Sequence, residues 1–214
     1  SWPENRLILT PDEYDDRWVA ESGVEGARTD FYGLCGFAYE TMYLGFLWIF
    51  RITDGKNDGP ISVELVSSRD GVNWRRQDAP RPPILPLGSD GAWDDGMLFT
   101  PNHPLVEGDT IKLFYGGFDN THGGDANAAI GIATLRKDGF ASMRAADEPG
   151  MLTTPPLRNA SGPLRVNYAA GEGGSLRVEV LDAAGNVWPG YSRMDCAPLT
   201  GDQVNGKVAW AGKS

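Results

Sequence analysis

Three aspartates in aromatic surroundings are the residues of this sequence best suited to chemistry. Asp30 stands two positions before Tyr32, and Asp94 and Asp95 follow Trp93. Hydrolysis of a glycosidic bond uses two carboxyl groups about 5–10 Å apart, and aromatic rings provide faces on which sugars stack. The three aspartates are therefore candidate catalytic carboxylates, and the two aromatic residues are candidate stacking surfaces.

Each candidate also has a purely architectural interpretation. Asp30 can pair with Arg28 or cap a turn, and residues 91–97 can form a tight Asp-Gly turn with Trp93 as a packing residue. Arg28 is in turn a candidate substrate contact. His122 lies in a loop rich in Gly, Asn and Asp, where it serves either as an acid, base or hydroxyl donor or as a loop residue without a chemical role.

These candidates occupy matching places in an internal repeat. The first copy has an apolar strand over residues 43–50 and a second over 61–71, which ends in an Asp-Gly turn before Trp74. Sixty-eight positions later the same order recurs over residues 111–118 and 129–139. A repeated all-β unit of this kind is typical of β-propeller blades, whose first strands line a central funnel. The copies run from about residue 28 to 74 and from about 91 to 143. The candidates at the start of each copy are therefore expected to face a ligand.

Composition agrees with an all-β protein and restricts its partners. The 214 residues include 28 Gly and 15 Pro, which favours turn-rich β structure. The net charge of −10 would repel a phosphate backbone, so no nucleic-acid partner is expected. The longest apolar stretch, residues 43–50, is too short to cross a bilayer, and no membrane partner is expected.

Two cysteines are too few for a cysteine-rich metal site, and neither a metal nor a cofactor is expected. Cys35 and Cys196 fall in regions that the sequence assigns to different domains. Two buried free thiols are the favoured interpretation, and a disulfide is the alternative.

The sequence divides into three segments. Residues 149–214 differ in texture from the repeats, because apolar and polar side chains alternate over 164–168 and 175–181, as they do in half-buried antiparallel strands. The predicted segments are a lead-in over residues 1–27, two four-stranded propeller blades over 28–148, and a partial β-sandwich over 149–214.

The order of these motifs resembles a known fold family. The stretches 63–74, 93–96 and 114–117 look like the later blades of the five-bladed propeller shared by glycoside hydrolase families 32, 43 and 68. The continuation, including residues 175–182, is similar to a largely uncharacterised bacterial group with a family-32-like propeller followed by a β-sandwich. The resemblance implies a glycoside hydrolase-like protein that acts on or binds a poly- or oligosaccharide.

The chain departs from that family in its catalytic motifs. The Asn-Asp-Pro-Asn motif of family 32 and its Glu-Cys motif do not occur, and residues 28–30 match its Arg-Asp-Pro motif only loosely. The alternative function is therefore a non-catalytic carbohydrate-binding or interaction module. A ring of five 68-residue blades needs about 340 residues. We therefore expect self-association or pairing with a missing N-terminal propeller half.

Overall fold

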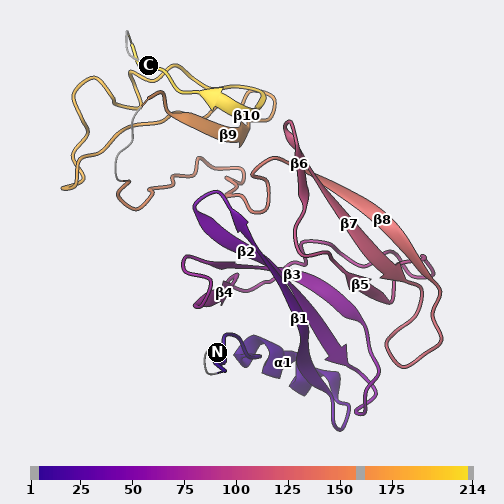
Figure 1. The fold of residues 1–214 in the computed structure, drawn as a ribbon. Coiled ribbons are helices and arrows are strands. Elements are labelled where there is room, and N and C mark those ends of the chain that lie inside the picture. Colours follow the sequence, from indigo (N-terminus) through magenta and orange to yellow (C-terminus); the bar gives the residue numbers. More distant parts are fainter. Residues whose placement is uncertain (1–4, 158–161, 212–214) are drawn as a thin grey trace. The chain divides into compact units, whose positions relative to one another are not determined.

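The chain is mostly β-sheet, as predicted for the all-β class. The computed structural model describes residues 5–157 and 162–211, and within them it holds one short helix (Figure 1). The chain divides into two compact units, Ser1–Leu135 and Arg136–Ser214, which are treated separately below. Nowhere in the described ranges is a helix both long and apolar enough to span a membrane.

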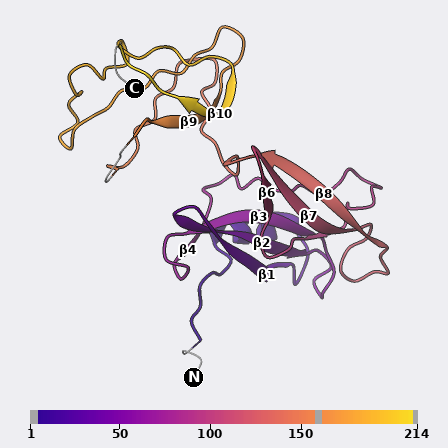
Figure 2. The same cartoon turned by 45° about the horizontal axis from the view of Figure 1, so that its top comes forward.

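The first unit contains one mixed sheet of eight strands that does not close on itself. Strands β1 to β4 follow one another as antiparallel neighbours. Strands β5 and β6 both pair with one side of β7, and β8 pairs with β7 as well; β6, β7 and β8 lie together in Figures 1 and 2. The two halves meet at a single parallel pair, Ile61 with Met97. The bounds are β1 Arg28–Tyr39, β2 Met42–Ile52, β3 Ile61–Ser68, β4 Trp74–Arg76, β5 Met97–Phe99, β6 Leu105–Glu107, β7 Thr110–Phe118 and β8 Ala128–Arg136.

The 68-residue repeat is visible in the order of the strands. Adding 68 to the residue numbers places β1 on β5 and β6, β2 on β7, and β3 on β8. The second copy differs from the predicted four strands. Its first strand is interrupted near Pro101 and Pro104, which cannot donate to a ladder. Residues 137–157 contain no counterpart of β4, so this copy has three strand positions.

Both faces of β2 are covered, which explains its nearly continuous run of apolar residues. On one face, residues of the first copy pack against Met97 of the second; this cluster consists of Phe50, Ile52, Ile61 and Met97. The other face is covered from within the first copy and the lead-in; its buried residues are Leu47, Ile49 and Val66. A strand buried on both faces needs no polar alternation.

The lead-in is more regular than predicted, because residues Glu13–Ser22 form helix α1. The side chain of Asp12 accepts a hydrogen bond from the backbone of Tyr14, and Asp15 reaches back to the amide of Asp12, which completes a capping box. Gly23 ends the helix with φ at 66°, a conformation that glycine adopts without steric cost. The acidic stretch of residues 12–16 therefore begins a helix.

A buried ion cluster attaches α1 to the sheet. The side chains of Asp15, Glu64 and Arg76 are 1 %, 8 % and 4 % exposed. Arg76 donates to Asp15 and also to Glu64, where Nε lies 2.9 Å from Oε2. Burial raises the pKa of Glu64, against the opposing effect of Arg76. Because α1, β3 and β4 each contribute one charge, the cluster fixes the helix on the sheet.

The pKa of Asp12 predicts how stability depends on pH. Hydrogen bonds from Arg81, at 2.8 and 2.7 Å, lower that pKa from 3.8 to about 2. A depressed carboxyl pKa adds stability above the unfolded value and loses it as the pH falls toward the folded value. We expect Asp12→Asn, which keeps a capping residue, to make the loss of stability between pH 3.8 and about 2 less steep. Urea unfolding at several pH values measures this, and equal slopes for both proteins would contradict it.

The second unit has little regular structure. Its strands β9, Arg165–Ala169, and β10, Asp202–Lys207, pair antiparallel above a core that consists of Cys196, Leu199, Val208 and Trp210. The strand predicted over residues 175–181 does not form. The two ends of this segment form isolated bridges with different parts of the chain, Leu176 with Leu199 and Leu181 with Val187. No continuous ladder of hydrogen bonds with one neighbouring strand therefore forms. The partial β-sandwich stays a prediction. Cys35 and Cys196 are free and buried, each in its own unit.

Candidate functional site

The start of β1 presents three of the predicted site residues. Arg28 and Asp30 lie on one face of the strand, two positions apart, and Tyr32 lies where the register of β1 against β2 shifts, between Phe31 and Gly33. Arg28 Nε lies 3.1 Å from Asp30 Oδ2, and Arg28 Nη1 donates to the carbonyl oxygen of Lys56 at 3.1 Å. The two side chains of the ion pair are 45 % and 47 % exposed. Their charges therefore face water, where a ligand can reach them.

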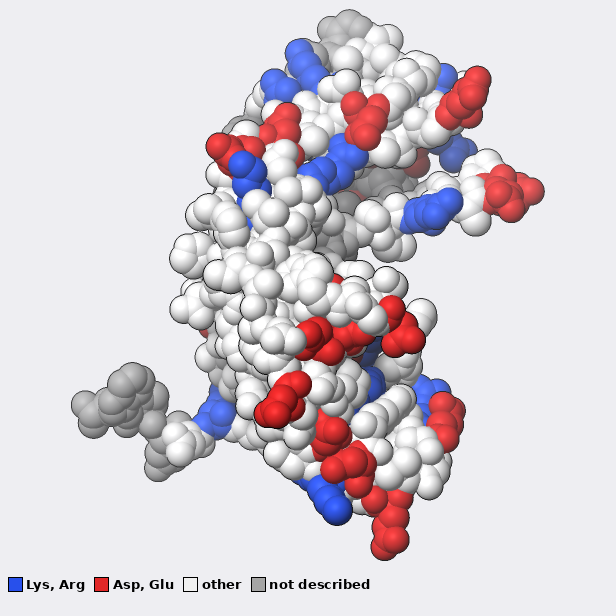
Figure 3. Space-filling view, turned by 90° about the vertical axis from the view of Figure 1, so that its right-hand side faces the viewer, with Lys and Arg blue, Asp and Glu red and all other residues white. Residues whose placement is uncertain are grey.

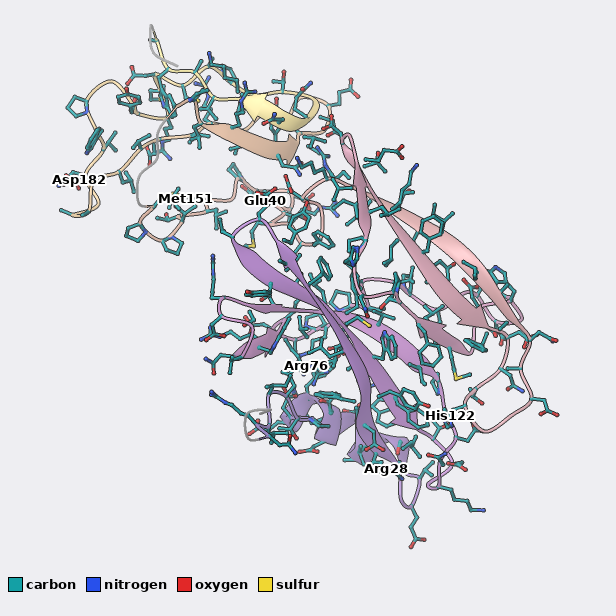
Figure 4. All side chains as sticks on the ribbon, viewed as in Figure 1. Arg28, Glu40, Arg76, His122, Met151 and Asp182 are labelled. Atoms are coloured by element: carbon teal, nitrogen blue, oxygen red, sulfur yellow. The ribbon has the colours of Figure 1, made fainter. Side chains whose placement is uncertain are left out.

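Tyr32 and His122 meet although 90 positions separate them. The Tyr32 hydroxyl lies 3.1 Å from His122 Nε2, and His122 Nδ1 lies 3.1 Å from the carbonyl oxygen of Asn57. With the hydrogen on Nδ1, the ring donates to this carbonyl and Nε2 accepts from the tyrosine. With the hydrogen on Nε2, the ring donates to the tyrosine oxygen and Nδ1 accepts from Asn57 Nδ2, which lies 3.4 Å away. Figure 4 shows Arg28 and His122 at the same end of the β1–β2 pair.

The aromatic rings of Phe50 and Phe99 pack against this pair. The Tyr32 ring packs edge-on against Phe50 and Phe99, with centroids 5.7 and 5.9 Å apart. The His122 ring lies 4.8 Å from Phe50. Phe50 is buried and Tyr32 is exposed, so this group of rings extends from the core to the solvent. We call the rings of Tyr32, Phe50, Phe99 and His122 the aromatic shelf.

The carboxylate of Asp58 and a backbone hydrogen bond join the two loops that carry Asn57 and His122. Asp58 Oδ1 accepts from the backbone amide of Gly123 at 2.7 Å, and the amide of His122 donates to the carbonyl of Gly59 at 3.1 Å. The amide of Gly123 and the side chain of Thr121 lower the pKa of Asp58. The loops are thus held together before any ligand binds. We call Arg28, Asp30, Tyr32, Asn57 and His122 the β1 site.

The other predicted residues form a second group. The Tyr115 hydroxyl donates to Asp94 Oδ2 at 2.8 Å, and the Trp93 and Tyr115 rings stack with centroids 5.7 Å apart. Burial, followed by the hydrogen bond to Asp94, raises the pKa of Tyr115 to about 12. Asp95 accepts from the amide of Gly91 at 2.6 Å, so its carboxylate closes a turn.

The structure does not bring the two groups together. A Cβ at Gly117 would touch Trp93 and Asp94, whereas the next residue, Phe118, packs on Phe99 of the aromatic shelf. Successive side chains of a strand point to opposite faces, so the groups lie on opposite faces of β7. No hydrogen bond or ion pair of the described residues connects Asp30 with Asp94 or Asp95. Catalytic roles for the three aspartates stay predictions.

Sequence reasoning missed Asn57 and Tyr115. Asn57 sits in a turn-forming stretch, residues 53–60, whose composition indicates only a loop. Tyr115 lies within the apolar strand predicted over residues 111–118, where the pattern indicates a packing residue. In the described part of the chain, no group of three or more His, Cys, Asp or Glu residues could hold a metal ion. A cavity of about 360 Å³ near the far end of β1 contains none of the predicted site residues; it is lined by Gly36, Phe37, Ala38, Tyr39, Asn102, His103, Pro104 and Val106.

Comparison with known proteins finds similarity to one carbohydrate-active protein over part of its length. No family model matches the chain. The chain is 26 % identical over 144 residues to an A type blood N-acetyl-α-D-galactosamine deacetylase from Flavonifractor plautii. The match covers 67 % of this chain but only 17 % of that protein. The comparisons do not confirm the resemblance to glycoside hydrolase families 32, 43 and 68.

A solved structure also matches part of the chain. It is an N-acetylgalactosamine deacetylase from F. plautii in complex with blood group B trisaccharide, at 20 % identity and a TM-score of 0.38. The match covers 53 % of this chain and 35 % of that one. A TM-score this low supports no conclusion about a shared fold.

Proposed function

We propose that this chain is the carbohydrate-binding part of a carbohydrate-active protein and that its ligand is a glycan containing an N-acetylated hexosamine. The β1 site is the observation that carries the proposal. An exposed aromatic ring beside charged and neutral hydrogen-bonding groups is what a sugar requires, because its C–H face stacks and its hydroxyls need donors and acceptors. Tyr32 supplies the ring, Arg28 donors and Asp30 acceptors.

The sugar class follows from the sequence relative. That protein is named a deacetylase of an N-acetylated galactosamine, and it is 26 % identical to this chain over 144 residues. The match covers only 17 % of the relative's length. We therefore propose binding of such a sugar for this chain and leave removal of the N-acetyl group to the named relative.

Glycosidic-bond hydrolysis is the alternative function. It would need Asp30 to work with Asp94 or Asp95 across one bond. The separation of these residues onto opposite faces of β7 favours binding over hydrolysis. We also retain two domain assignments as proposals. The matching order of β1–β3 and β5–β8 supports propeller blades over residues 28–148. A partial β-sandwich over 149–214 has only the antiparallel pair of β9 and β10 in its favour.

Replacing Tyr32 tests the proposal. We expect Tyr32→Ala to weaken binding of an N-acetylgalactosamine-terminated oligosaccharide at least about tenfold, since loss of one stacked ring removes a major contact. Tyr43→Ala is the matched control, because Tyr43 is 41 % exposed, close to the 48 % of Tyr32, but lies outside the site. Calorimetric titration measures both variants.

Two results would contradict the proposal. One is the absence of glycan binding by the unsubstituted chain. The other is equal weakening by Tyr32→Ala and Tyr43→Ala, which would place binding elsewhere. Release of reducing sugar without release of acetate from the same oligosaccharide would support the glycosidase alternative.

A further inference from the structure

Strand β8 is an unpaired sheet edge that lacks the features that usually protect one. It is nine residues long and pairs only with β7 among the described strands, with its other edge on the outside of the sheet (Figure 1). Edge strands usually carry charged residues, prolines or bulges that prevent further pairing. Residues 128–135 contain no charged residue and no proline, and the charge of the strand is confined to Arg136 at its last position.

The same strand exposes large apolar side chains on one face. Ile130 and Ile132 are 82 % and 53 % exposed. A Cβ on Gly131 would lie 2.4 Å from the Tyr115 ring, so Gly131 faces Tyr115, and the two isoleucines point to the opposite face. Phe114 is also exposed and, as the neighbour of Tyr115, shares that opposite face. We call Phe114, Ile130 and Ile132 the β8 patch.

The residue order along β8 suits pairing with itself. Residues 129–133 read Ala-Ile-Gly-Ile-Ala, which is the same in both directions about Gly131. In an antiparallel pair of two such strands centred on Gly131, Ile130 of one copy lies opposite Ile132 of the other. Likewise, Ala129 lies opposite Ala133. Two-fold symmetry makes both contacts occur twice.

Charge does not oppose the pairing of β8 with a second copy at this edge. The chain carries a net charge of −10, so most of its surface repels a copy of itself. Pairing along residues 128–135 places no like charges opposite each other, because neither strand has any. Figure 3 faces the side on which β8 lies in Figure 1 and shows an area without Lys, Arg, Asp or Glu, with charged side chains of both signs around it.

We propose that two copies of this chain associate through antiparallel pairing of their β8 strands about a two-fold axis at Gly131. Backbone hydrogen bonds then satisfy the open edge of each sheet, and the β8 patches form one continuous apolar surface. The eight-stranded sheets of two copies become a single sheet of sixteen strands, by doubling the eight strands of one copy. This proposal is independent of the carbohydrate proposal.

Sedimentation equilibrium of the whole chain tests the association. We expect a reversible dimer whose dissociation constant rises at least about tenfold in Ile132→Lys, because each copy loses an apolar cross-strand pair and gains an edge charge. Leu105→Lys is the control, since Leu105 is equally exposed, at 53 %, but lies on β6. It should dimerise like the unsubstituted chain. A monomer at about 0.5 mM, well above the dissociation constants of ordinary small interfaces, would overturn the proposal. So would an undiminished dimer in Ile132→Lys.

Cysteine cross-linking tests the register of the two β8 strands. The native cysteines do not interfere, because both are buried. The chain with Ile130→Cys and the chain with Ile132→Cys should form a disulfide-linked dimer rapidly when mixed, because these positions face each other across the axis. Each variant alone should cross-link at least about tenfold more slowly, since its diagonal partner is about 7–8 Å away. Equal rates for the mixture and for the separate variants would overturn the register.

Discussion

Replacing Arg76 by Met should lower the free energy of unfolding by about 3–5 kcal/mol, the cost of stranding buried charges that have lost their partner. Arg76 is the cation between Asp15 and Glu64, and all three side chains are almost inaccessible to water. Arg51 lies 3.5 Å from Asp15 but makes no ion pair with Glu64, so it cannot replace Arg76 at both carboxylates. The guanidinium also lies 4.9 Å above the Phe31 ring, a contact that the variant loses.

Arg75→Met is the matched control for this measurement. Arg75 precedes Arg76 on β4, but it is exposed and makes no ion pair with any residue of the described ranges. We expect its effect to stay within about 0.5 kcal/mol, as for most surface substitutions. Urea unfolding followed by circular dichroism gives both values. Similar small effects for both variants would contradict the buried ion cluster.

Replacing Asp30 by Asn should weaken glycan binding at least about tenfold, since the β1 site loses its charged acceptor. Folding should change little. The Arg28–Asp30 pair is about half exposed, and exposed ion pairs contribute only about 0–1 kcal/mol. Binding and stability therefore respond differently to the same substitution, which separates a ligand role from a structural one.

Asp95→Asn is the control for Asp30→Asn. The carboxylate of Asp95 accepts from the amide of Gly91 and belongs to the other group of predicted residues, so its loss should not alter glycan affinity. Calorimetry and thermal unfolding of the two variants give the comparison. A large loss of stability in Asp30→Asn with unchanged affinity would make Asp30 structural and remove it from the β1 site.

The strands were predictable because the same pattern of apolar residues occurs in both copies of the repeat. Apolar runs at residues 43–50 and 111–118 became β2 and β7, and the 68-residue spacing carried over to their neighbours. Helix α1 was missed because its acidic first turn was interpreted as solvated lead-in. The capping pair Asp12 and Asp15, with Gly23 at the other end, was the signal for it.

The contacts between distant residues were beyond the reach of the sequence. Asp15 and Arg76 are 61 positions apart, and charged residues are exposed in most contexts. Tyr32 and His122 were each predicted as ligand contacts, but their hydrogen bond depends on how β1 lies against the loop after β7. The one-residue difference between Gly117 and Phe118 decides which face of β7 each group occupies. The local sequence does not indicate which face of β7 lies toward the β1 site.

Mapping a glycan titration by ¹⁵N–¹H nuclear magnetic resonance tests the central claim most directly. On addition of an N-acetylgalactosamine-terminated oligosaccharide, we predict that resonance shifts gather at the Arg28 Nε–H, the side-chain amide of Asn57 and the backbone amides of His122 and Gly123. The amides around Trp93 and Asp95 should stay unchanged. Shifts confined to the Trp93 group, or no shifts at all, would contradict the assignment of carbohydrate binding to the β1 site.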